Sequence, residues 1–160
     1  MVPYLINDMT YQLQIRDYHP NDRDFVIAIM ELNVPQYFAV SEVADLSDYL
    51  EYHIEKYFVV LIDGKIIGAG GINFENNGAV ISWDFIDPAF HGKGIGRKLL
   101  QHRIQLIKSM EDIATITVRT SQLTYKFYEK SGFVLKNMIK DYWAKGFDLY
   151  GMEYKPQGNY

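Results

Sequence analysis

The sequence predicts an α/β (α+β) fold with a mixed, mostly antiparallel central sheet of about seven strands flanked by roughly four helices. Three observations lead to this fold class. Strand and helix patterns follow one another along the chain in the order β-αα-βββ-α-β-α-ββ. The turn signals Asp63-Gly64 and Asn76-Asn77-Gly78 join the second, third and fourth strands as antiparallel hairpins. A helix separates the fourth and fifth strands, so a right-handed crossover makes these two parallel.

The expected strands are short segments rich in β-branched and aromatic residues. Residues 115–118 (Thr-Ile-Thr-Val) are β-branched throughout. The last two strands are expected to be joined by an aromatic loop, residues 141–148, which contains Tyr142, Trp143 and Phe147. The expected strands are residues 11–16, 57–62, 65–74, 79–86, 115–118, 133–139 and 148–154.

Apolar residues at helical spacing predict the helices. The first is expected to begin at Asn21 as its N-cap. Phe25, Ile29 and Leu32 would share its inner face. The other helices are expected within residues 45–56, 94–110 and 123–130.

Composition indicates a single globular domain over residues 1–160, long enough to bury a core. Hydrophobic residues make up 48% and charged residues 22% of the chain, which are ordinary globular values. The net charge of −4 argues against a nucleic-acid partner and suits a cationic acceptor such as an amine.

Several classes of site are disfavoured by what the sequence lacks. It has no cysteine, which excludes disulfides, thiolate metal sites and a cysteine nucleophile. The histidines show no metal-ligand spacing, so no metal is expected. No apolar run approaches about 18 residues, so no membrane partner is expected and the predicted location is cytoplasmic.

A glycine-rich loop lies between an expected strand and the longest expected helix. Glycines let the backbone come close to a ligand, and the helix N-terminus presents unpaired N–H groups with a partial positive charge. Cationic side chains in the loop add full charges, so a pyrophosphate is the expected ligand. The residues expected to bind it are His91, Gly92, Lys93, Gly94, Ile95, Gly96 and Arg97.

The glycine-rich loop allows other interpretations. A P-loop needs Gly-Lys followed by Ser or Thr, and this loop does not supply that order. The dinucleotide fingerprint needs a third glycine where Arg97 stands. A site for a phosphorylated nicotinamide cofactor stays open as an alternative because Arg119 ends the next strand. The glycines could otherwise serve only a tight turn.

Two motifs together resemble those of the GNAT acetyltransferase superfamily. Residues 87–100 resemble its coenzyme A loop, whose pattern is Gln/Arg-x-x-Gly-x-Gly/Ala; Gly94 and Gly96 match, whereas His91 stands in place of Gln or Arg. Residues 127–133, Phe-Tyr-Glu-Lys-Ser-Gly-Phe, are similar to the family's Leu-Tyr-Glu-Lys-Leu-Gly-Phe segment. The resemblance implies a GNAT-like fold in which the parallel fourth and fifth strands splay apart.

The resemblance also implies an activity and a set of site residues. The activity is transfer of an acetyl group from acetyl-CoA, as co-substrate, to a primary amine of a small molecule or peptide. Tyr128 corresponds to the family's proton donor to the leaving thiolate, and Asp84, Phe85 and Ile86 correspond to the strand that binds pantetheine. Ser121 stands where the family often has an asparagine that contacts the carrier; alternatively it caps the short helix that follows. Both Tyr128 and Ser121 are therefore candidates for carrier binding.

The general base is less well defined by the sequence. Many members of the family carry an acidic residue on the fifth strand, but residues 115–120 contain none. Asp84 is taken with Tyr128 as the candidate catalytic pair, while Glu75, Glu31 or a water chain remain alternatives. The missing acid also leaves open a carrier-binding module without catalysis, which would act as a sensor or interaction subunit.

The acceptor is expected to enter between residues 33–45 and residues 141–148. The aromatic residues Tyr37, Phe38, Tyr142 and Trp143 could form one wall of this entrance. Exposed aromatic residues also mark subunit contacts, so the C-terminal region is compatible with a homodimer.

Overall fold

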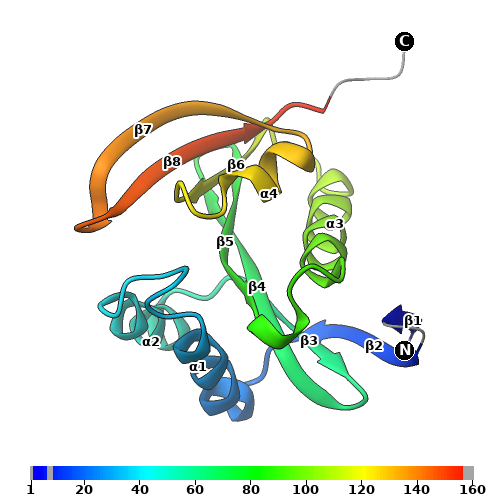
Figure 1. Ribbon diagram of the computed structural model, residues 1–160. Coiled ribbons are helices and arrows are strands. Elements are labelled where there is room, and N and C mark those ends of the chain that lie inside the picture. The colour runs from blue at the N-terminus through cyan, green and yellow to red at the C-terminus, as the bar shows by residue number, and fades with distance from the viewer. Residues whose placement is uncertain (1, 7–8, 157–160) are drawn as a thin grey trace.

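The computed structural model describes residues 2–6 and 9–156 of the chain. Within these residues, eight strands form one sheet, and helices lie on both of its faces (Figure 1). The strands are β1 (Val2–Ile6), β2 (Met9–Asp17), β3 (Lys56–Ile62), β4 (Lys65–Glu75), β5 (Gly78–Ile86), β6 (Thr115–Thr120), β7 (Phe133–Ala144) and β8 (Phe147–Tyr154). The helices are α1 (Arg23–Leu32), α2 (Glu42–Tyr52), α3 (Ile95–Lys108) and α4 (Tyr125–Lys130), with two 3₁₀ turns, η1 (Pro20–Asp22) and η2 (Pro88–Phe90).

The sheet is mixed, as the sequence predicts. Its strands lie in the order β1-β2-β3-β4-β5-β6-β8-β7, and β5 and β6 are its parallel pair. The other neighbours are antiparallel, and α3 forms the crossover between β5 and β6. The described residues hold one strand more than the expected set of about seven, because β1 pairs with β2 at the N-terminal edge.

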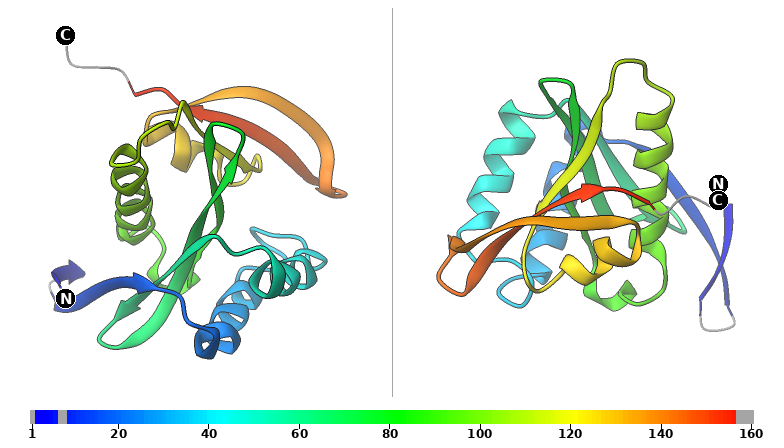
Figure 2. Two further views of the ribbon diagram at one scale, coloured as in Figure 1. Left: turned by 180° about the vertical axis from the view of Figure 1, so that it is seen from behind. Right: turned by 90° about the horizontal axis from the view of Figure 1, so that it is seen from above.

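Helices cover the two faces of the sheet (Figure 2), and a separate core is buried on each face. On one face α1 and α2 pack on β3, β4 and β5, and Val26, Met30 and Leu46 are fully buried there. On the other face α3 packs on the sheet through Leu99 and Leu100. None of the helices in the described part of the chain is long and apolar enough to cross a lipid bilayer.

The first α-helix begins one residue later than expected, since the N-cap of α1 is Asp22 and not Asn21, and η1 precedes it. The N-cap of η1 is His19: the His19 imidazole accepts a hydrogen bond from the Asn21 backbone N–H, and the Asp22 carboxylate accepts one from the His19 N–H. Asp22 therefore completes the capping box. Arg16 on β2 donates to both oxygens of Asp22, at 2.8 and 3.0 Å, which ties the strand to the helix.

The buried face of α1 also differs from the expected one. Val26, Ile29 and Met30 are buried, whereas Phe25 and Leu32 are 63% and 58% exposed. Ile29 is common to the expected and the actual buried face, but its buried neighbours are Val26 and Met30, so Phe25 and Leu32 lie toward solvent.

Residues 141–148 form the end of a long hairpin and not the expected aromatic loop. β7 and β8 are joined by Lys145 and Gly146, and Gly146 has a φ of +84° that suits glycine. The Asp141 carboxylate accepts a hydrogen bond from the Gly146 N–H at 2.7 Å. The Asp148 carboxylate accepts one from the Asp141 N–H at 2.9 Å, which links the two strands where the ladder is interrupted between the pairs Ile139–Leu149 and Ala144–Phe147.

Candidate active site

A β-bulge on β5 directs the Asp84 side chain toward α3 and α4. Trp83 and Asp84 both lie opposite Gly70 of β4, where the register shifts by one residue. Because side chains alternate between the faces of a strand, one extra residue reverses the faces of all that follow. Trp83 has a φ of +48°, in the left-handed region that bulky residues rarely adopt. The Tyr57 hydroxyl donates to the Trp83 carbonyl at 2.8 Å and supports the bulge.

The parallel strands β5 and β6 separate just before this bulge. Their pairing runs from Gly78 and Thr115 to Ile81 and Val118. Both strands continue beyond that point, β5 to Ile86 and β6 to Thr120. The expected splay is therefore present, and within the described sheet residues 82–86 do not pair with β6.

The loop from β5 to α3 is shaped by two glycines in the left-handed region. Gly92 has a φ of +73°, and Gly94, the N-cap of α3, has a φ of +79°. Before them, the Asp87 carboxylate accepts a hydrogen bond from the Ala89 N–H at 2.9 Å and caps η2. The first turn of α3 consequently begins beside the gap between β5 and β6.

His91 links this loop to the end of β5 and to the segment after α1. Its Nε2 lies 2.8 Å from the Ile86 carbonyl, which also accepts a hydrogen bond from the Asn33 side chain at 3.1 Å. A carbonyl only accepts hydrogen bonds, so this contact assigns the imidazole proton to Nε2. The Tyr37 ring packs edge-on against the imidazole, with 5.0 Å between the ring centres. His91 therefore has a local structural role in the position where the family pattern has Gln or Arg.

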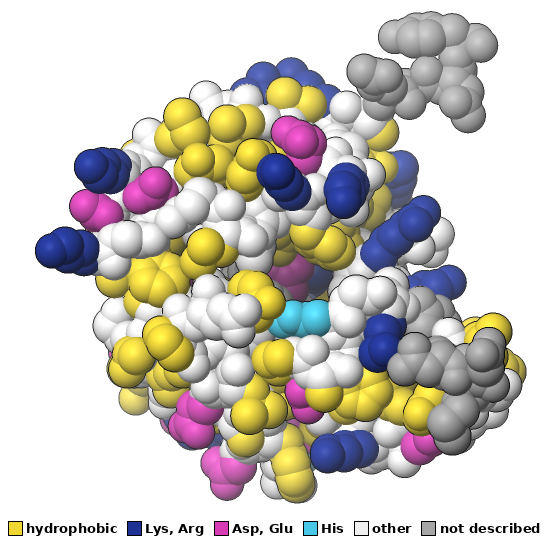
Figure 3. Space-filling view, in the orientation of Figure 1, with side chains coloured by type: hydrophobic (Ala, Val, Ile, Leu, Met, Phe, Trp, Pro, Cys, Tyr) yellow, Lys and Arg dark blue, Asp and Glu magenta, His cyan; other side chains and the backbone are white. Residues whose placement is uncertain are grey.

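A cavity of about 770 Å³ lies where β5 and β6 separate. This volume is within the usual range for small-molecule sites. Figure 3 shows a hollow in this face, with Lys and Arg side chains gathered over α3 and α4. The expected site residues that line the cavity are Asp84, Phe85, Ile86, His91, Gly92, Gly94, Ile95, Gly96, Arg97, Ser121 and Tyr128. Lys93 belongs to the loop but is not among the lining residues.

Four of the expected site residues that line the cavity also belong to the buried cores: Phe85, Ile86, Ile95 and Tyr128. Phe85 is 5% exposed and packs with the α1 and α2 side, and Ile95, the first residue of α3, is 1% exposed on the opposite face. For these two residues the backbone is the part available to a ligand.

Tyr128, Asp84 and Arg103 form a connected network at the cavity wall. The Tyr128 hydroxyl donates to Oδ1 of Asp84 at 2.5 Å, and Nη2 of Arg103 donates to Oδ2 at 2.8 Å. Tyr128 is 5% exposed and Arg103 is fully buried, whereas the Asp84 side chain keeps 15% exposure. The bulge on β5 is what brings Asp84 to this face.

The environment of Tyr128 strongly favours its protonated form. Burial raises the pKa of Tyr128 well above its ordinary value of 10.0, and the negative charge of Asp84 raises it further. The positive charge of Arg103 lowers this pKa but does not outweigh the other two effects. The phenol therefore keeps its proton at neutral pH until the charges around it change.

Arg103 is a site residue that the sequence reasoning missed. It lies on the apolar stripe of α3, four residues after Leu99 and three after Leu100. A charged residue at such a position, facing a sheet, indicates a buried partner of opposite charge. That signal was available in the sequence, although it does not identify Asp84 as the partner.

Ser121 lines the cavity but does not cap α4. The helix begins at Tyr125, two residues later than expected, and its N-cap is Thr124. The Ser121 hydroxyl instead accepts a hydrogen bond from the Leu123 N–H at 3.2 Å, within the turn that precedes the helix.

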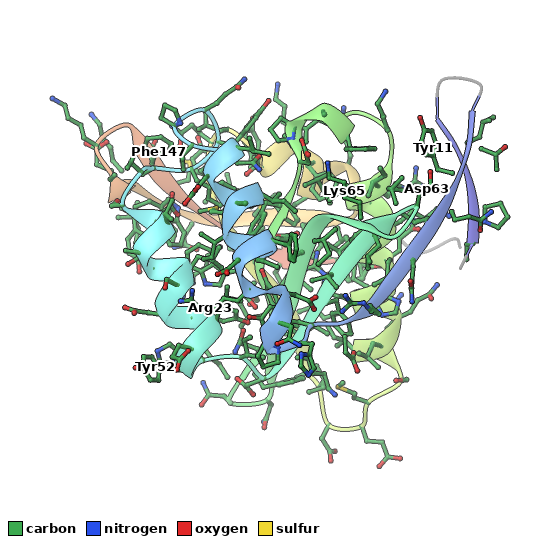
Figure 4. All side chains as sticks on the ribbon, turned by 90° about the horizontal axis from the view of Figure 1, so that it is seen from below. Tyr11, Arg23, Tyr52, Asp63, Lys65 and Phe147 are labelled. Carbon is green, nitrogen blue, oxygen red and sulfur yellow. The ribbon has the colours of Figure 1, made fainter. Side chains whose placement is uncertain are left out.

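Aromatic residues from two distant segments line another part of the cavity. Tyr37 and Phe38 follow α1, and Trp143 and Phe147 come from the β7–β8 hairpin; all four are lining residues. Figure 4 labels Phe147 on the hairpin end, near the chain that follows α1. Tyr142 was expected in the same wall, but it is 46% exposed and packs on Trp143 without lining the cavity.

Of the acidic residues that the sequence offered as candidate bases, not all lie in the site. Glu31 and Glu75 are exposed and do not line the cavity, which leaves Asp84 as the lining residue among the candidate bases. Glu42 also lines the cavity and is 5% exposed. Its carboxylate accepts a hydrogen bond from the Ala39 N–H at 2.7 Å, and burial raises its pKa above the ordinary value.

Comparison with known proteins identifies the class of protein that this fold and cavity define. The profile of the Acetyltransferase (GNAT) family matches residues 26–133. The chain belongs to this family and is an enzyme of the acetyltransferase class. Sequence reasoning from the two motifs is confirmed at this level.

Individual proteins resemble this chain in sequence or in structure. The human Cysteine-rich protein 2-binding protein is 30% identical over 114 residues, which are 69% of this chain but only 14% of that protein. Ard1 from Thermoplasma volcanium has a similar structure, with a TM-score of 0.73 and 21% identity over 91% of this chain and 99% of its own. An aminoglycoside 6′-N-acetyltransferase complexed with coenzyme A has a TM-score of 0.69 and 13% identity, covering 91% of this chain and 99% of its own. The two structures show a shared fold.

Proposed function

We propose that this protein transfers the acetyl group of acetyl-CoA directly to a primary amine of a small molecule or peptide, and that residues 1–160 form one GNAT-like catalytic domain. The observation that carries the proposal is the 2.5 Å hydrogen bond between Tyr128 and Asp84 in the cavity between β5 and β6. A proton donor and a carboxylate in direct contact can supply both proton transfers that amide formation requires. The family match and the coenzyme A complex of a protein with the same fold support the carrier.

The loop before α3 is the proposed site of the coenzyme A pyrophosphate. The backbone N–H groups of Ile95, Gly96 and Arg97 belong to the first turn of α3, where they have no partner within the helix. The partial positive charge of the helix N-terminus and the Arg97 guanidinium suit an anion. The edge of residues 84–86 that does not pair with β6 would hold the pantetheine arm by backbone hydrogen bonds, apart from the Ile86 carbonyl, which already accepts from His91 and Asn33.

Asp84 and Tyr128 would divide the proton transfers between them. As the amine nitrogen bonds to the acetyl carbon and the carbon–sulfur bond breaks, Asp84 takes a proton from nitrogen and Tyr128 gives its proton to sulfur. A phenol with a raised pKa releases its proton reluctantly while its neighbour is a carboxylate. Once Asp84 is protonated, it can donate to the phenolate oxygen, which stabilises that charge. The proton then passes from Asp84 to Tyr128 and restores both groups.

The acceptor side of the cavity suits a cation. An amine reaches the site mainly as an ammonium ion at neutral pH, and it loses one proton to solvent before its nitrogen attacks the thioester. Trp143 and Phe147 offer aromatic faces, and Glu42 and Asp84 offer carboxylates in the same cavity. The net charge of −4 also attracts a cation at longer range.

Calorimetric titration with acetyl-CoA, followed by a thiol-release assay over a panel of amines, tests this proposal. The wild type should bind acetyl-CoA and release thiol with at least one primary amine. Tyr128→Phe should bind acetyl-CoA as well as the wild type, while kcat falls by about 100- to 10,000-fold because the proton donor is lost. Tyr125→Phe is the matched control, since Tyr125 lies on the same helix but packs on Tyr150 outside the cavity.

The possible outcomes separate the functional alternatives. Binding of acetyl-CoA without thiol release for any amine would favour a carrier-binding module without catalysis. Absence of acetyl-CoA binding would contradict the proposal. Thermal protection by a phosphorylated nicotinamide cofactor in its place would favour an oxidoreductase.

A further inference from the structure

The Arg103 guanidinium is a fully buried charge that reaches from α3 across β4 to β5. It donates through Nε to the Leu99 carbonyl at 3.3 Å, through Nη1 to the Gly71 carbonyl at 3.1 Å, and through Nη2 to Asp84 at 2.8 Å. A buried charge is strongly unfavourable unless it is paired and its donors are satisfied. The ion pair with Asp84 balances the charge, and each of the three guanidinium nitrogens has a hydrogen-bond acceptor.

β4 leaves space for this arrangement because it has glycine at residue 70. A Cβ atom on Gly70 would lie 3.0 Å from Nη1 of Arg103 and 2.8 Å from the Asp84 Cβ. A side chain at this position would push the guanidinium and the carboxylate apart. The Arg103–Asp84 contact therefore depends on three features: Gly70 on β4, the bulge on β5, and a charged residue on the apolar face of α3.

The two oxygens of Asp84 have different partners. Oδ2 accepts from Arg103, and Oδ1 accepts from the Tyr128 hydroxyl. The carboxylate cannot rotate about its Cβ–Cγ bond without breaking the ion pair. Its orientation toward Tyr128 is thus fixed by a residue that does not line the cavity.

We propose that Arg103 is a positioning residue for acetyl transfer: it holds one oxygen of Asp84 and thereby directs the other at Tyr128. The inference rests on the proposed function, because it assigns to Arg103 control of the pair that moves the protons. The guanidinium also balances the charge of Asp84 before the reaction. When Tyr128 gives up its proton, the same positive charge stabilises the phenolate.

Arg103→Lys separates positioning from folding, because it keeps the charge but cannot serve three acceptors in fixed directions. We expect kcat to fall by about tenfold or more, while the KM for acetyl-CoA and for the amine changes less than about threefold. A purely structural role would lower stability and would not act selectively on kcat. Arg16→Lys is the matched control, because Arg16 forms a bidentate pair with Asp22 and neither residue lines the cavity.

A double substitution tests whether Arg103 acts through the catalytic pair. In the Tyr128→Phe background, Arg103→Lys should cause no further loss of kcat, since the contact that it positions is already absent. If Arg103→Lys does not fold, Arg103→Met combined with Asp84→Asn removes both charges together. That variant should bind acetyl-CoA and have the same kcat as Asp84→Asn alone.

The results distinguish this inference from the proposed function. An active wild type with an inactive Tyr128→Phe, together with a folded Arg103→Lys of unchanged kcat, would overturn the role of Arg103 and leave the function intact. Losses that multiply in either double variant would overturn it in the same way. A wild type that acetylates no amine would overturn the function and this inference with it.

Discussion

Gly94 and Gly96 lie two residues apart in the proposed carrier site and differ in whether they tolerate an added side chain. Gly94 has a φ of +79°, whereas Gly96 lies inside α3 and an added Cβ would meet Phe127 at an ordinary 3.5 Å. A side chain in the left-handed region costs about 1–2 kcal/mol. We therefore expect Gly94→Ala to lower the free energy of unfolding in urea by that amount and to weaken acetyl-CoA binding. Gly96→Ala should change both quantities little, and an equal effect of the two substitutions would contradict this account.

At the same scale, the sequence identified the residues that belong to local motifs better than those that act across the fold. Tyr128 was found because its neighbours in the chain form the motif. Asp84 was a candidate among several acids, and its contact with Tyr128, 44 residues away, emerges only from the folded chain. Arg103 was missed because its importance depends on a partner on another strand.

Among the elements, the β7–β8 hairpin contributes one wall of the cavity and is tied to the end of β6. The Trp143 indole N–H donates to the Thr120 carbonyl at 3.1 Å. Trp143→Phe removes this donor, so the free energy of unfolding should fall by about 1 kcal/mol. The KM for the amine should rise severalfold because the wall shifts, while calorimetry should give an unchanged Kd for acetyl-CoA.

Tyr142→Phe is the control for this prediction, because Tyr142 is exposed beside Trp143 and does not line the cavity. It should leave the amine KM unchanged. A weaker acetyl-CoA Kd in Trp143→Phe, with a normal amine KM, would assign the hairpin to the carrier site.

Element types were predictable from local pattern, whereas the features that shape the site were not. The turn signals around Gly64 and Gly78 specified the hairpins of β3, β4 and β5. The bulge at Trp83 has no such signal, because it consists of one extra residue relative to β4 and depends on pairing register. Residues 141–148 were expected to form an aromatic loop, although aromatic residues are also common in strands.

For the whole molecule, buried tyrosines predict how stability depends on pH. Burial raises the pKa of both Tyr57 and Tyr128 well above the ordinary value of 10.0. Above about pH 10 these phenols ionise in the unfolded chain but stay protonated in the folded one, so the unfolded state binds fewer protons and stability falls as pH rises. Each tyrosine should contribute a slope of about 1.4 kcal/mol per pH unit.

Urea unfolding of the wild type and Tyr128→Phe from neutral to alkaline pH measures this slope. Ionisation of lysines is common to both proteins, so the difference between the two curves isolates Tyr128. The difference should be constant below about pH 9 and shrink at higher pH. A difference that does not change with pH would show that Tyr128 ionises as readily in the folded chain as in the unfolded one.

The homodimer suggested by the aromatic C-terminal region stays a prediction, as does the cytoplasmic location. β7 lies at one edge of the sheet and carries exposed apolar side chains.

Both tryptophans of the chain line the cavity, Trp83 from the bulge on β5 and Trp143 from the β7–β8 hairpin. The intrinsic fluorescence of the protein, excited at the red edge of the indole band where tyrosine absorbs little, therefore comes only from residues at the cavity wall. Occupancy of the cavity can be followed optically, in real time and without a label. The two emitters can be separated by replacing Trp143 with Phe, which leaves Trp83 at the bulge as the single reporter.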